Sequence, residues 1–247
     1  MKLALVTDLH ANREAVAAVR AHAQQQHIDR FVFLGDLVGY GADPAWVVDW
    51  VRDEVARGAW VVKGNHDHAV AGSAPSTMRD EVQQAIAWTQ QQLSSDQLDF
   101  LSQLPLECQA QDLLFVHANA VAPAQWAYIE SRSDAGRSLQ ATTQRVVFCG
   151  HTHAPMLYHL SRLGKLGEFT PMAGTPVPLM PQRQWLVIPG AAGQPRDGNP
   201  AACYATYDTR DFALTFWRVP YDHDAAAAKI LKAGLPSAFA HRLRHGR

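Results

Sequence analysis

The alternation of short apolar runs with longer amphipathic stretches constrains the fold of this chain more than any other feature. Apolar runs at residues 3–7, 31–34 and 60–62 read as buried strands. Helical spacing of apolar residues begins after Asn12, a plausible N-cap, and again at Pro44, which suits the first turn of a helix. Strands that alternate with helices are typical of α/β folds. The chain is therefore predicted to be an α/β protein.

The rhythm of the sequence changes in the last third of the chain. Two further buried strands are predicted at residues 113–116 and 146–149, but from Ala154 onward strands and turns dominate. The later apolar runs suggest a second sheet, and they lie at residues 185–188, 203–207 and 212–219. No repeat or low-complexity linker interrupts the chain, so residues 1–247 are predicted to form a single domain.

Two helical segments need separate interpretations. Residues 71–104 are helical in pattern and rich in glutamine, and we interpret them as a cap beside a site; an ordinary surface pair of helices is an equally good alternative. A C-terminal helix is predicted from about Asp222 to Lys232 and ends at Gly234. The arginine-rich stretch at residues 242–247 is interpreted as a fraying helix end rather than a binding arm.

Composition excludes several classes of protein. The chain is 47% apolar, which suffices for a core, and 22 basic against 23 acidic residues give no general surface for nucleic acid. Its longest apolar runs are far shorter than the about 20 residues that a membrane-spanning helix needs. Three cysteines without paired spacing make a disulfide framework unexpected. A cytoplasmic protein without membrane contact is predicted, and the sequence leaves its oligomeric state open.

Polar side chains of the kinds that bind metals follow five separate predicted strands. In open α/β sheets the ligand crevice lies beyond the carboxyl ends of the strands, so these side chains are expected to converge there. A lone Asp or His after a strand usually forms a turn or a surface contact, but the joint pattern favours a metal site. The seven candidates are Asp8, His10, Asp36, Asn65, His117, His151 and His153.

The number of candidates favours two metal ions over one. A tetrahedral zinc takes four ligands, whereas seven divide between two ions if Asp36 bridges them. Two divalent cations outweigh the two carboxylates, so the site is expected to prefer an anionic substrate such as a phosphate ester. The candidates include no cysteine, which allows manganese, iron, zinc, magnesium or nickel.

The motifs around these residues resemble those of the calcineurin-like metallophosphoesterase family. The family's blocks D-x-H, G-D, G-N-H-D, a single central histidine and G-H-x-H occur here in the same order between residues 3 and 155. A further segment at residues 189–198 resembles a P-G-S-x-G-Q-P-R-D-G stretch of a bacterial and archaeal branch that is often described as phosphodiesterases. The resemblance therefore extends over nearly the whole chain.

The resemblance implies a fold and a division of the site. The fold would be a four-layer α/β/β/α sandwich, in which two mixed β-sheets are faced by helices. Asp8, His10 and His153 would bind one metal ion, and Asn65, His117 and His151 the other, with Asp36 between them. His66 would act as the acid beside the leaving oxygen, or would orient the phosphate.

One departure from the family pattern bears on the substrate. The family's protein phosphatases continue G-D into x-x-D-R-G, but here Leu37 to Gly41 follow Asp36 and supply neither the Asp nor the Arg. A phosphodiester carries less charge than a monoester dianion, so the sequence favours a phosphodiesterase that acts on a small phosphate ester through a metal-activated hydroxide. Phosphomonoester hydrolysis is expected as a side activity.

Three further residues receive paired interpretations. Asp67 either orients His66 or caps a helix. Tyr40 either flanks the substrate or packs within its loop, and Arg196 either contacts phosphate or stabilises a turn. Two other functions stay open for the whole chain: a non-catalytic protein-binding scaffold of the same fold, and a nucleotide pyrophosphohydrolase or phosphomonoesterase.

Overall fold

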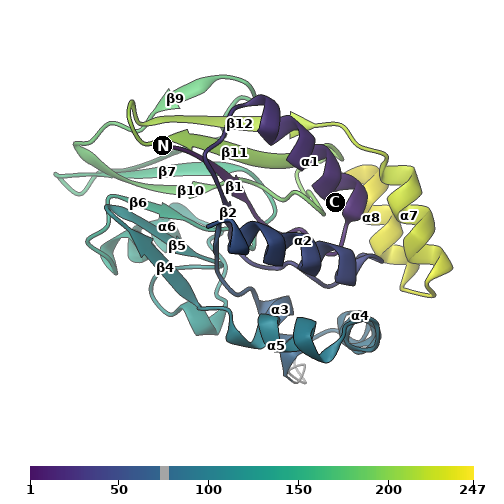
Figure 1. The fold of residues 1–247 in the computed structure, drawn as a ribbon. Helices are drawn as coiled ribbons and strands as arrows, with labels where there is room; N and C mark the ends of the chain where they lie inside the picture. The colour runs from purple at the N-terminus through teal and green to yellow at the C-terminus, as the bar shows by residue number, and fades with distance from the viewer. Residues whose placement is uncertain (73–77) are drawn as a thin grey trace.

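The computed structural model describes residues 1–72 and 78–247, which form two six-stranded sheets packed face to face with helices on both outer sides (Figure 1). The first sheet has the strand order β3-β2-β1-β11-β12-β9, and the second has the order β4-β5-β6-β10-β7-β8. The strands are β1 (Lys2–Val6), β2 (Arg30–Phe33), β3 (Trp60–Val61), β4 (Glu107–Ala110), β5 (Leu113–Val116), β6 (Val146–Phe148), β7 (Met156–Ser161), β8 (Leu166–Phe169), β9 (Pro176–Pro178), β10 (Arg183–Ile188), β11 (Ala202–Asp208) and β12 (Ala213–Val219).

Helices cover the two sheets on opposite sides. They are α1 (Arg13–Gln25), α2 (Pro44–Ala56), α3 (Asn65–Ala71), α4 (Asp80–Gln92), α5 (Ser95–Gln103), α6 (Arg132–Gln140), α7 (His223–Lys232) and α8 (Ser237–His245), with a short 3₁₀ helix, η1, at Pro123–Gln125. Helices α1 and α2 lie against the first sheet and α6 lies against the second. No helix in the described residues is long and apolar enough to cross a membrane.

Alternating side chains along the strands build the layers. In β1, Leu3 and Leu5 enter the cluster between the two sheets, whereas Ala4 and Val6 pack with the buried faces of α1 and α2. In the second sheet, Phe148 faces the same central cluster and Val147 packs against α6. Because successive residues of a strand point to opposite faces, strands covered on both sides must be apolar throughout. The four-layer sandwich is confirmed.

The grouping of the late strands into one second sheet is wrong. Strands β11 and β12 join the first sheet, where β11 pairs antiparallel with β1. Strand β10 belongs to the second sheet and pairs parallel with β6. Hydrophobic alternation identifies a strand and its faces, but it carries no information about the neighbour with which the strand pairs. Both sheets are mixed, as predicted.

The predicted helix starts are confirmed, and the structure adds detail at three places. The Asn12 side chain accepts a hydrogen bond from the Ala15 backbone N–H, and Pro44 occupies the first turn of α2. Helix α3 was not predicted. Within residues 71–104 the structure shows α4 and α5, and residues 73–77 of that segment lie outside the described residues. The arginine-rich stretch begins in the last turn of α8, which ends at His245, so the prediction of a helix end there is confirmed.

Glycine at position 193 is required by close backbone packing beside β1. A Cβ atom there would lie 1.9 Å from the Leu9 carbonyl oxygen. We expect Gly193→Ala to destabilise the fold by about 1–3 kcal/mol and to lower the melting temperature by roughly 2–12 °C, measured by thermal unfolding. Gly164→Ala is the control, because Gly164 has a positive φ but has no atom within 4 Å of the added Cβ. Because Gly193 does not have a left-handed φ, backbone conformation cannot account for its loss, and an unchanged melting temperature in Gly193→Ala would exclude the collision.

Candidate metal centre

The seven predicted ligands meet at one edge of the sandwich, beyond the carboxyl ends of β1, β2, β5 and β6. Asp8 and His10 follow β1, Asp36 follows β2, His117 directly follows β5, and His151 and His153 follow β6. Asn65 is the first residue of α3, which begins shortly after β3 of the first sheet has ended. Six of the seven side chains are buried, and Asn65 is half-buried.

Four of these residues form a first group. Ligand atoms of Asp8, His10, Asp36 and His153 all lie within 4.8 Å of one another. The Nε2 atoms of His10 and His153 are 3.2 Å apart, and His153 Nε2 is also 3.2 Å from Asp8 Oδ1. His10 Nε2 lies 3.7 Å from Asp36 Oδ2.

A second group forms on the other side of Asp36. Ligand atoms of Asp36, His117 and His151 also lie within 4.8 Å of one another. His117 Nε2 is 3.4 Å from Asp36 Oδ2, 3.1 Å from His151 Nδ1 and 3.2 Å from Asn65 Oδ1. Asp36 is therefore the carboxylate that both groups share.

Hydrogen bonds to backbone carbonyls fix the orientation of three histidines. The Nδ1 atoms of His10, His117 and His153 lie 3.1, 2.7 and 2.7 Å from the carbonyl oxygens of Val38, Leu34 and Gln194. A carbonyl only accepts, so each Nδ1 carries the hydrogen, and in the neutral ring Nε2 presents a lone pair to the cluster.

Several lone pairs in the cluster have no protein hydrogen to accept. Two Nε2 atoms that both present lone pairs, as those of His10 and His153 face each other here, cannot bond to each other, and Asp8 Oδ1 is buried without a hydrogen-bond partner among the described residues. Buried polar atoms are normally satisfied, so this concentration of unsatisfied acceptors requires an explanation. Imidazole and carboxylate donors at these separations fit divalent metal ions.

Five of the seven predicted ligands have backbone conformations that are uncommon outside glycine. Their φ angles are +53° for Asp8, +46° for His10, +52° for Asp36, +69° for His151 and +61° for His153. Such residues are strained by about 1–3 kcal/mol each and cluster at functional sites. Backbone hydrogen bonds between the loops stabilise these conformations. The Asp8 N–H donates to the Gly35 carbonyl oxygen at 3.1 Å, and the Gly150 N–H donates to the His117 carbonyl oxygen at 2.8 Å.

Comparison with known proteins identifies the family. A model of the calcineurin-like phosphoesterase superfamily domain matches residues 1–211. The chain belongs to the calcineurin-like phosphoesterase superfamily. It is 32% identical over 255 residues to an uncharacterized protein of Methanocaldococcus jannaschii, and the alignment covers 99% of this chain and 98% of the relative.

Solved structures agree with this membership of the phosphoesterase superfamily. The crystal structure of a metallophosphoesterase from Sphaerobacter thermophilus is 33% identical and has a TM-score of 0.89 over 100% of this chain and 99% of that one. A hypothetical protein from Pyrococcus horikoshii OT3 shares the fold at 19% identity, with a TM-score of 0.80 over 100% of this chain and 98% of that one.

The electrostatics of this phosphoesterase site favour the charged form of Asp36 and the neutral forms of His10 and His151. Burial raises the pKa of Asp36, but His117, His66 and His10 outweigh it and hold that pKa well below its usual value. Burial lowers the pKa of His10, and it lowers the pKa of His151 to about 3. His117 differs: burial opposes protonation, yet the nearby Asp36 carboxylate raises its pKa to about 9. A metal ion bound at His117 would therefore have to displace a proton.

His66 lies beside the two ligand groups of the phosphoesterase without joining them. It is 4% exposed, and its ring centroid lies 5.0 Å from that of His10. Its backbone N–H donates to Asp36 Oδ1 at 2.8 Å, which connects the first turn of α3 to the shared carboxylate. The buried Nδ1 atom has no hydrogen-bond partner among the described residues, and it faces the backbone of Gly39.

The Asp67 side chain bonds to backbone groups around the start of α3. The Asp67 carboxylate accepts hydrogen bonds from the backbone N–H groups of Gly64 at 3.0 Å, Leu37 at 2.8 Å and Val38 at 3.3 Å. Its carboxylate oxygens therefore accept hydrogen bonds from backbone N–H groups rather than from the imidazole of His66. Asp67 thus joins the start of α3 to the loop after β2; it lies in the first turn of α3, and Gly64 rather than Asp67 is the N-cap residue.

Tyr40 and Arg196 lie next to each other at the rim of the site. The Tyr40 ring centroid is 4.6 Å from that of His10 and 4.5 Å from that of His66. The Arg196 Cζ atom lies 5.8 Å from the centroid of the Tyr40 ring, and its Nη2 atom donates to Gln194 Oε1 at 3.0 Å. The roles of both residues in substrate binding stay predictions.

Sequence reasoning missed two aromatic residues of the site. The Tyr128 ring stacks on His151 with centroids 3.9 Å apart, and 48% of Tyr128 is exposed. The Trp126 ring lies 5.9 Å from that of His117. Both residues come from the irregular segment between β5 and α6, in which no periodic pattern or motif singles them out.

Proposed function

We propose that this chain is a phosphodiesterase with two divalent metal ions. Asp8, His10 and His153 would hold one ion, and Asn65, His117 and His151 the other, with Asp36 between them. The observation that carries the proposal is the position of Asp36 Oδ2, which lies 3.7 Å from His10 Nε2 in one group and 3.4 Å from His117 Nε2 in the other. Bound there, the cations would supply a water of lowered pKa and positive charge beside the phosphate.

The residues around the ligands have distinct proposed roles. His66 donates a proton from Nε2 to the departing oxygen, because Nδ1 faces the Gly39 backbone. Arg196 lies on the rim and contacts the phosphate with its guanidinium group, and Tyr40 flanks the substrate. The exposed Tyr128 ring offers a flat apolar surface on the opposite ligand group.

The loop after Asp36 favours a phosphodiester substrate over a dianionic phosphomonoester substrate. The backbone N–H groups of Leu37 and Val38 are both occupied by Asp67, so this loop does not offer them to phosphate. Within the sequence motifs that carry the resemblance, the arginine beside Tyr40 is Arg196. A phosphoryl group with a single charge matches this limited set of donors better than a dianion does.

Reconstitution with defined metals tests the proposal. Protein stripped by chelator and loaded in turn with manganese, iron, zinc, magnesium or nickel would be assayed on bis(p-nitrophenyl) phosphate, on p-nitrophenyl phosphate and on a nucleotide panel. We expect a metal-dependent kcat/KM that is at least about tenfold higher for the diester. Higher turnover of a nucleoside di- or triphosphate would instead indicate a pyrophosphohydrolase. A metal-loaded protein that is inactive on every substrate would overturn the proposal.

A further inference from the structure

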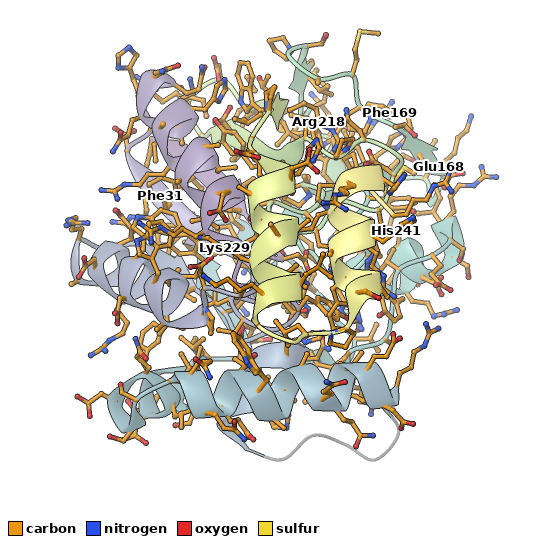
Figure 2. The ribbon with its side chains drawn as sticks, turned by 90° about the vertical axis from the view of Figure 1, so that its right-hand side faces the viewer. Phe31, Glu168, Phe169, Arg218, Lys229 and His241 are labelled. Carbon is orange, nitrogen blue, oxygen red and sulfur yellow. The ribbon has the colours of Figure 1, made fainter. Side chains whose placement is uncertain are left out.

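The C-terminal helical hairpin α7–α8 reaches the rim of the site, outside the residues that the superfamily domain covers. Phe239 of α8 lies with its ring centroid 4.8 Å from that of Tyr40, and both belong to one buried cluster with Ala85 of α4 and Leu243. Figure 2 shows the hairpin face-on, with Lys229 on the side of α7 toward α1 and α2. Lys229 Nζ lies 2.6 Å from Glu14 Oε1 and 2.8 Å from Asp43 Oδ2, which fastens the hairpin to the sandwich.

This hairpin places a second arginine on the rim. The Arg242 Cζ atom lies 5.9 Å from the centroid of the Tyr40 ring, and the Arg196 Cζ atom lies 5.8 Å from the same centroid. Tyr40 itself contacts His10 and His66. Two guanidinium groups from distant parts of the chain therefore lie near one tyrosine. Arg242 also lies 5.5 Å from the ring centroid of Phe239 on its own helix.

Arg242 differs from its neighbours in having no acidic partner. Arg244 on the same helix pairs with Asp224 at 2.8 Å, and Arg218 pairs with Asp197. Among the described residues no carboxylate lies within ion-pair distance of Arg242, and the polar side-chain contacts of Arg196 are to the neutral Gln194 amide. Both guanidinium groups lack an acidic partner among the described residues, so each is available to bind an anion.

We propose that Arg242, beside Tyr40, forms a subsite for a second phosphate group of the substrate, remote from the phosphorus that reacts and from the phosphate contact proposed for Arg196. The inference rests on the proposed function and narrows its substrate to esters that carry an additional phosphate. Arg242 lies next to Tyr40 and belongs to neither ligand group, so we assign it to a different group from the one that the metal centre holds.

Two esters with the same leaving group test the subsite. Thymidine 5′-(p-nitrophenyl phosphate) and its 3′-phosphorylated form differ only in the second phosphate. We expect the wild-type KM to be about tenfold lower for the phosphorylated ester at equal kcat, and Arg242→Ala to raise that KM about tenfold while changing the other KM by less than twofold. Arg242→Lys keeps the charge and should restore part of the preference. Arg244→Ala is the matched control and should keep the full preference.

A direct binding measurement tests the subsite independently of the proposed phosphodiesterase activity. Calorimetric titration of metal-free protein with thymidine 3′,5′-bisphosphate and thymidine 5′-monophosphate requires no turnover, so it applies even if neither ester is cleaved. We expect tighter binding of the bisphosphate by the wild type and loss of that difference in Arg242→Ala. If wild type and Arg242→Ala discriminate equally, or if the substitution weakens both ligands alike, the subsite does not exist and Arg242 only supports Tyr40.

Discussion

Asp36→Asn is expected to lower kcat/KM for bis(p-nitrophenyl) phosphate by at least about 10³-fold and to reduce the metal content below two ions per chain. Asp36 is the carboxylate that both ligand groups share, so the substitution removes a negative charge from each of them. Asparagine has nearly the same shape, and its Oδ1 atom can still accept the hydrogen bond from the His66 backbone N–H. The loss should therefore come from metal binding rather than from misfolding.

Metal analysis after dialysis and circular dichroism measure the two parts of this expectation. Asp29→Asn is the control, because Asp29 lies before β2, at the opposite end of that strand from Asp36, and accepts a hydrogen bond from the Lys2 backbone N–H. The control should retain both ions and wild-type activity. A folded Asp36→Asn protein that still holds two ions with unchanged affinity would contradict the shared role of Asp36.

His66→Ala is expected to slow turnover of a dinucleoside monophosphate about 10²–10³-fold, but turnover of bis(p-nitrophenyl) phosphate less than about fivefold. The first substrate loses an alkoxide, which needs a proton as it departs, whereas p-nitrophenolate leaves without one. His66 is placed to donate that proton because it lies beside His10 and Asp36. Burial lowers the pKa of His66, and the Asp36 carboxylate partly opposes that shift.

The comparison of kcat for the two leaving groups is the decisive measurement. His68→Ala serves as the control, because His68 lies on the same helix, is exposed and belongs to neither ligand group. It should leave both rates near the wild-type values. Equal slowing of both substrates by His66→Ala would mean that His66 positions the phosphate rather than protonating the leaving oxygen.

The convergence of the ligands could be predicted because it follows from the direction of the strands. Asp8, Asp36 and His117 each lie just beyond a parallel strand, and parallel strands end at the same edge of a sheet. The continuous apolar run at residues 3–7 likewise predicted a strand that is buried on both faces. These inferences use only local pattern and chain direction.

The parts that escaped prediction depend on contacts between distant segments. Local sequence composition does not predict that β1 pairs with β11, nor that Phe239 packs against Tyr40. The role of Asp67 was also hidden, since a carboxylate next to a histidine in sequence turned out to bond the backbone of Leu37 and Val38. The left-handed backbone of the ligands was equally invisible, because Asp and His rather than glycine occupy those positions.

The position of β1 between β2 and β11 has a consequence for synthesis on the ribosome. Residues 2–6 gain their antiparallel neighbour only when residues 202–208 have been made. At about 5–20 residues per second, the wait lasts roughly 10–40 s, during which one edge of the first strand has no partner. Nascent chains of this protein should therefore depend on protection of that edge until translation is nearly complete.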